Sequence, residues 1–122
     1  MDAKTATVEE LRRYSAEIVG RARGWEYDHV FGGFTEMFPS PWHPDKDYDQ
    51  IRMVEEAVYP VSRDWRLVIN YVNYPGTMWY AGYEDVGRAE FTIKAYAFDT
   101  TELLTRLRLA CHLHGMATTQ GG

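Results

Sequence analysis

Four acidic residues have the spacing of a calcium-binding loop. Positions 1, 3, 5 and 12 of the EF-hand pattern, where oxygens converge on one cation, match Asp45, Asp47, Asp49 and Glu56. Gln50 stands where that loop needs a glycine, and the residues from Ile51 to Glu56 have a helical pattern that carries Glu56 away from the aspartates. A helix start with acids in its first turn explains the same residues through the helix dipole. We therefore expect no metal at this position.

The cysteine and histidines near the end of the chain could suggest zinc. His112 and His114 lie about 200° apart around a helix, so they cannot face one ion, and Cys111 is expected to be a small core residue. The sequence has no Gly-x-Ser-x-Gly nucleophile motif and no glycine-rich phosphate loop after a strand. We expect no cofactor and no identifiable catalytic residue. Whether the protein is an enzyme stays open, because a carboxylate pair formed across the fold leaves no sequence signal, but the balance is against it.

A concentration of aromatic residues in the second half of the chain could bind a ligand. Stacking rings next to a guanidinium can hold a nucleotide base, and the candidate set is Tyr71, Tyr74, Trp79, Tyr83 and Arg88. The alternative is that cross-strand aromatic pairs only stabilise a sheet.

The first half of the chain is acidic. Residues 1–60 hold 12 of the 18 Asp and Glu residues and 7 of the 13 Lys and Arg residues, and the net charge is −5. This balance argues against binding to duplex nucleic acid, which needs a basic face. It favours a partner protein with a basic surface, contacted through Trp42, Asp45, Asp47 and Asp49. The alternative is a solvated acidic face with no partner.

Periodicity predicts three helices and three strands. Apolar spacing indicates helices at about 7–23, with a Thr7–Glu10 capping box, at about 47–58 with Asp47 or Asp49 as cap, and from Asp99 or Thr100 to Gly115. Alternation predicts strands at 65–74, 77–83 and 89–98, separated by turns at Pro75-Gly76 and Asp85-Val86-Gly87; in the third strand, Ile93, Ala95 and Ala97 are expected on one face. Residues 24–46 are expected to form a long aromatic loop without regular structure, either a lid over the core or a site.

These elements predict one α+β domain at residues 1–116 with a frayed tail at 117–122. The element order is α-α-β-β-β-α, with the strands forming an antiparallel meander. Because both sheet faces carry apolar residues, we expect an α/β/α-type sandwich, with a two-layer sandwich as the alternative.

Several short motifs resemble the phage ABA sandwich domain family of small bacteriophage and prophage proteins. They are an N-terminal helix ending in Gly24-Trp25, a Pro-rich loop with Trp42 and Pro44, a helix at 48–58, a strand pair around Trp79, and the stretch 95–101 before the last helix. The resemblance implies an α/β/α sandwich and a viral origin, and it implies no catalytic residues.

The leading hypothesis is a phage accessory protein that binds a host defence protein stoichiometrically and inhibits it, similar to anti-CRISPR proteins in size and charge. A nucleotide or signalling-nucleotide sponge, a small hydrolase and a self-associating structural domain stay open as alternatives. A single cysteine, and no apolar stretch of a signal peptide or membrane span, predict a cytoplasmic protein in the host bacterium that does not bind membranes.

Overall fold

The computed structural model describes residues 2–60, 64–73, 76, 78–85 and 92–115. The fold is α+β, and its helices and long strands follow the predicted order. The helices are α1 (Val8–Arg23), α2 (Tyr48–Val58) and α3 (Glu102–His114), and the long strands are β3 (Trp65–Val72), β4 (Met78–Asp85) and β5 (Thr92–Asp99). The tail at 117–122 and the expected turn residues 75, 86 and 87 lie outside the described residues.

The helix ends follow local sequence signals. The capping box of α1 is present, with the Glu10 amide donating to the Thr7 hydroxyl and the Glu10 carboxylate accepting from the Thr7 amide. Asp47 caps α2, as predicted. The cap of α3 is Thr101, not Asp99 or Thr100, because the Asp99 carboxylate is engaged by Arg108 further along α3.

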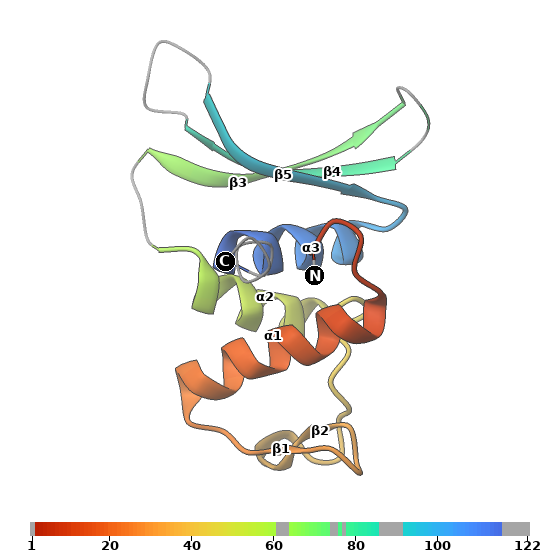
Figure 1. Cartoon of the computed structure of the whole chain (residues 1–122), viewed down its shortest axis with the longest axis vertical. Coiled ribbons are helices and arrows are strands. Elements are labelled where there is room, and N and C mark those ends of the chain that lie inside the picture. The colour runs from red at the N-terminus through yellow and green to blue at the C-terminus, as the bar shows by residue number, and fades with distance from the viewer. Residues whose placement is uncertain (1, 61–63, 74–75, 77, 86–91, 116–122) are drawn as a thin grey trace.

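Three strands form an antiparallel sheet with β4 at its centre, in the order β3-β4-β5. Helix α3 packs against β4 and β5, α1 and α2 pack against α3, and all three helices lie on one side of the sheet (Figure 1). We call the covered side the inner face and the other side the outer face. The layering therefore differs from a sandwich with helices on both sides of the sheet and matches the two-layer alternative, since no described element covers the outer face.

Side-chain size explains why α3 selects the inner face. Ala81, Ala95 and Ala97 are buried there, and their small side chains allow α3 to approach closely and bury Leu109 against the sheet. On the outer face the rings of Tyr80, Tyr96 and Phe98 surround Gly82, so a helix could not approach the strands as closely there.

The strands also differ from expectation in two details. A β-bulge at Lys94 breaks the alternation of β5, so Ile93 pairs with Glu84 on the outer face while Ala95 and Ala97 face α3. The expectation that these three side chains share a face was wrong. Asp85 was expected in a turn, but it ends β4 and pairs with Trp65.

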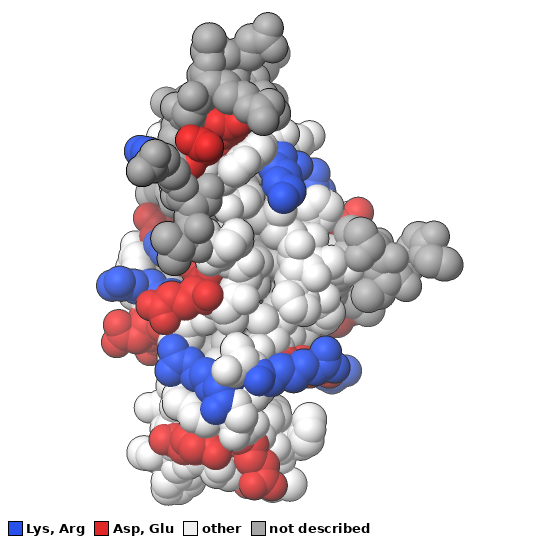
Figure 2. Space-filling view, turned by 90° about the vertical axis from the view of Figure 1, so that its left-hand side faces the viewer, with Lys and Arg blue, Asp and Glu red and all other residues white. Residues whose placement is uncertain are grey.

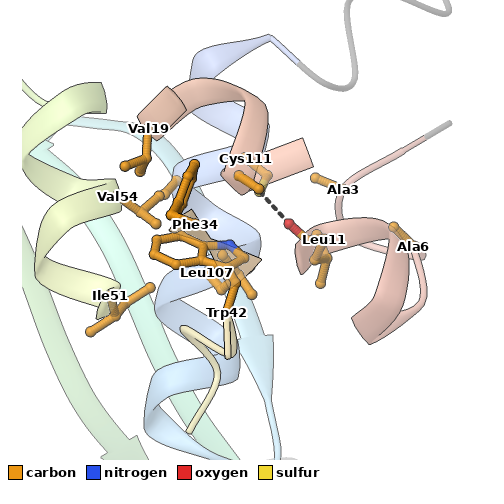
Figure 3. Close-up of a cluster of buried hydrophobic side chains, with 12 residues drawn as sticks. Ala3, Ala6, Leu11, Val19, Phe34, Trp42, Ile51, Val54, Leu107 and Cys111 are labelled. Atoms are coloured by element: carbon orange, nitrogen blue, oxygen red, sulfur yellow. Dashed lines mark hydrogen bonds between the residues drawn. The ribbon is translucent and has the colours of Figure 1, made fainter. Parts of the chain in front are cut away.

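The larger core lies between the three helices and is completed by the aromatic loop (Figure 3). Phe34 and Trp42 are buried among Val19, Ile51 and Leu107. The Trp42 indole N–H donates to the Ser15 hydroxyl and to the Arg12 carbonyl, at 3.1 Å each. The loop thus seals the core, and it contains regular structure that was not expected: β1 (Tyr27–Asp28), β2 (Gly33–Phe34) and a short 3-10 helix, η1 (Thr35–Met37).

The N-terminal segment is attached to the last helix. The Arg108 guanidinium donates to the carbonyls of Ala3 and Ala6, at 3.0 and 2.6 Å, and it also pairs with Asp99. Ala3 and Ala6 are buried in the main core. Contacts that close the fold therefore join residues about a hundred positions apart.

Candidate functional site

The outer face of the sheet is the candidate site. Antiparallel register places Tyr80 opposite Phe98, Gly82 opposite Tyr96 and Glu84 opposite Ile93. The side chains of Ile93, Tyr96 and Phe98 keep 41%, 44% and 41% of their surface exposed. We call Tyr80, Ile93, Tyr96 and Phe98 the outer-face cluster.

A glycine shapes the centre of this face. A Cβ atom on Gly82 would lie 2.1 Å from the Tyr80 hydroxyl oxygen and 2.8 Å from Glu84 Oε2. Tyr80 thus lies along its own strand across Gly82, and its hydroxyl donates to Glu84 Oε2 at 2.6 Å. The ring covers the carboxylate, because Glu84 is only 6% exposed. Burial and the bond to Glu84 both raise the pKa of Tyr80, so its phenol stays protonated as a donor at neutral pH.

The other rings extend the cluster toward the β5 edge. Ring centroids of Tyr80 and Phe98 lie 5.3 Å apart, and those of Tyr96 and Phe98 lie 5.8 Å apart. The Lys4 ammonium lies 4.0 Å from the centroid of the Tyr96 ring, within cation–π range. The outer-face cluster therefore combines exposed aromatic surface, which is enriched at the centres of protein interfaces, with a lysine at its edge, where charged residues are usual.

The residues predicted to bind a ligand do not form one group. Tyr71 and Trp79 lie together on the inner face, with ring centroids 5.0 Å apart. Tyr83 is buried at the other end of β4, between the rings of Tyr59 and Trp65 at 5.1 and 5.6 Å. Tyr74 and Arg88 lie outside the described residues. Ligand binding through Tyr71 and Trp79 stays a prediction.

The residues predicted to bind a partner have mainly internal contacts. Trp42 is 3% exposed and lies in the core. Asp45 accepts two hydrogen bonds from Arg12, at 2.7 and 2.9 Å, and Asp47 caps α2. Asp49 is exposed in the first turn of α2 and is the most accessible of the four. On the side of the molecule drawn in Figure 2, acidic and basic side chains are intermingled.

The cysteine and histidines considered as metal ligands or nucleophiles contact other parts of the protein. Cys111 is fully buried, burial raises the pKa of its thiol to about 12, and its thiol points to the Leu11 carbonyl at 3.9 Å (Figure 3). The expectation of a core residue is confirmed. The His114 Nδ1 atom lies 3.0 Å from the Tyr14 hydroxyl. Among the described residues, no three His, Cys, Asp or Glu side chains are grouped so that they could hold a metal ion.

The sequence did not single out Ile93, Phe98 and Glu84 as outer-face residues. The bulge hid Ile93, because strict alternation assigns it to the face of Ala95. The sequence did contain a signal for Glu84. Tyr80, Gly82 and Glu84 alternate along one strand and so share a face, and the glycine lets the tyrosine ring lie across it and reach the carboxylate.

Comparisons with protein-family models, with curated proteins and with solved structures found no match. None of the helices in the described part of the chain is long and apolar enough to cross a membrane.

Proposed function

We propose that this protein acts by binding a partner protein stoichiometrically through the outer face of its sheet. The observation that carries the proposal is that all three helices lie on the inner side, while the outer-face cluster exposes large side chains. Fully burying a side chain of this size from full exposure contributes about 1.5–3 kcal/mol, and because 41–44% of Ile93, Tyr96 and Phe98 is exposed, covering the remainder contributes roughly 0.6–1.3 kcal/mol for each. Several neighbouring rings on a rigid sheet therefore form a suitable interface centre.

The charged groups around the cluster favour a partner with an apolar patch bordered by acids. Lys4 lies over Tyr96, and Arg66 is exposed opposite Glu84 on β3, whereas Lys94 extends over the Trp65 ring of the inner face. Glu84 is covered by Tyr80 and contributes little to the surface. This surface differs from the predicted acidic one, for which Asp49 is the main accessible residue because Arg12 holds Asp45.

In its specific form, the proposal is that the partner is a host defence protein and that binding inhibits it. The resemblance to a phage family, the small size and the net charge of −5 motivate this choice of partner.

Site-specific photocrosslinking in bacterial cells tests the contact surface. A benzophenone amino acid at position 96 should crosslink to the partner, and the same probe at Phe38, which is 71% exposed in the loop after η1, should not. The crosslinked protein is then purified, and we expect a 1:1 complex by light scattering and loss of that protein's activity. Crosslinks only between copies of this chain, equal crosslinking from both positions, or a complex that leaves the partner fully active would overturn the proposal.

A further inference from the structure

Helix α1 and the β1–β2 unit lie on the side of the molecule far from the outer face (Figure 1). Residues of both line a groove. Its volume is about 350 Å³, and it adjoins a second hollow of about 470 Å³. Arg13, Tyr27 and His29 line both and form the junction between them.

Small residues on α1 open this groove. Ala16 and Gly20 lie one helical turn apart on the side of α1 that faces Phe34 and Trp25. A Cβ atom on Gly20 would lie 3.4 Å from the Trp25 carbonyl oxygen and 3.5 Å from Phe34 Cε1. Gly24 ends α1 in a left-handed conformation, after which the chain folds back beneath the helix.

Aromatic rings form one wall. The ring of Phe34 meets those of Trp25 and Tyr27 edge to face, with centroids 5.6 and 5.4 Å apart. His29 continues this wall, 5.1 Å from Tyr27. The wall therefore offers apolar surface on which a planar ring can pack.

Cations border the groove on the α1 side. Arg12, Arg13 and Arg21 line the two hollows, against the acids Glu9 and Glu17, in a chain of net charge −5. Arg12 is held by Asp45, whereas Arg13 forms no ion pair with any residue that the structure describes.

The electrostatic effect of these arginines reaches the junction. Burial raises the pKa of the Tyr27 phenol, and Arg12 and Arg13 act in the opposite direction by favouring its anionic form. The pKa of Tyr27 is raised overall, so the support for an anion at the junction comes from the position of the Arg13 guanidinium there and not from this pKa.

We infer that the groove binds a small planar molecule with one anionic group, a phosphate monoester or a carboxylate. The ring packs against Trp25 and Tyr27, which Phe34 supports from the core, and the anion lies between Arg13 and His29. A volume of about 350 Å³ falls within the range of small-molecule sites. The site shares no residue with the outer face, so it stands or falls independently of the proposed function.

Titration by NMR of the intact protein tests this site. The probes are phenyl phosphate and benzoate, with phenol supplying the ring alone and inorganic phosphate the anion alone. We expect phenyl phosphate or benzoate to bind saturably, at least about tenfold more tightly than either control, with shifts in the amides of α1 and in the Trp25 indole N–H. The tighter of the two probes identifies the anion.

Variants locate the binding. Arg13→Gln should weaken it at least about tenfold, since a charge-assisted bond to an anion contributes on the order of 1.5–3 kcal/mol. Arg52→Gln, which removes an exposed charge from α2, is the matched control and should bind as the native chain does. Gly20→Ala favours the helix but narrows the groove, so it should weaken binding severalfold. It is the variant to use if Arg13→Gln fails to fold. Equal binding of inorganic phosphate, no saturable binding by either aromatic anion, or equal effects of Arg13→Gln and Arg52→Gln would refute the inference.

Discussion

Replacing Gly82 by alanine should destabilise the protein, although alanine is normally the better strand residue. The added Cβ would lie 2.1 Å from the Tyr80 hydroxyl oxygen, so the ring must move and its bond to Glu84 is lost. A hydrogen bond to a charged group contributes about 1.5–3 kcal/mol, and replacing a strand glycine by alanine returns about 0.5–1 kcal/mol. The expected net loss is about 1–2 kcal/mol in the free energy of unfolding. With a urea slope of about 2 kcal/mol/M, the unfolding midpoint falls by roughly 0.5–1 M.

The control for this prediction is the same substitution in a Tyr80→Ala background. Without the ring, the Cβ at position 82 meets no phenol, and the Glu84 carboxylate oxygen at 2.8 Å is the end of a flexible side chain that can turn away, so Gly82→Ala should then raise the unfolding midpoint. Tyr80→Ala alone should destabilise the chain more than Gly82→Ala does, because it loses both the bond to Glu84 and the ring contact with Phe98 without the gain from alanine at position 82. If Gly82→Ala raises the midpoint equally in both backgrounds, Tyr80 does not lie across Gly82 in solution, and the description of the outer face is wrong.

Two further substitutions and one chemical reaction test contacts in the interior of the protein. Burial raises the pKa of Asp45, but the hydrogen bonds and charge of Arg12 outweigh it and hold the pKa below its usual value of 3.8. Stability from this pair is therefore present above about pH 4 and is lost as the pH falls through the folded-state pKa. Asp45→Asn should thus reduce the decline in the free energy of unfolding on the acid side, and an unchanged profile would exclude the pair as its source. The buried Tyr59 hydroxyl has no hydrogen-bond partner among the described residues, so Tyr59→Phe should preserve the free energy of unfolding or raise it by up to about 1 kcal/mol. A loss of stability measured by calorimetry would contradict this. Because burial raises the pKa of the Cys111 thiol to about 12, a disulfide reagent at pH 8 should react at least about 100-fold faster in urea than in buffer, and similar rates would show that the thiol is accessible.

Local signals in the sequence predicted most of the element boundaries. The Thr7–Glu10 capping box and the glycine at 115 act within one turn of the chain, so they were sufficient to place helix ends. Thr101 was missed as a cap because Asp99 and Thr100 are equally good candidates until the contact between Asp99 and Arg108 is known.

Layering and the site depended on contacts distant in the sequence. Composition alone suggested that both sheet faces need covering, whereas the alanines of β4 and β5 decide which face receives α3. The sequence around Asp45 does not show that this residue pairs with Arg12, because the two side chains meet only when α1 and the loop before α2 pack together. Ile93 was placed on the wrong face because one extra residue in a strand reverses the alternation on one side of it.

The attachment of Ala3 and Ala6 to Arg108 affects how the chain folds during synthesis. The partners of the first residues lie on the last helix, so the aromatic loop and α2 can cover only part of the apolar side of α1 before α3 has been made. Contacts of such long sequence separation form slowly, because a large loop must close before they contribute stability. A nascent chain stalled before Arg108 should therefore be sensitive to proteases and bound by chaperones, and it should become resistant once α3 is synthesised.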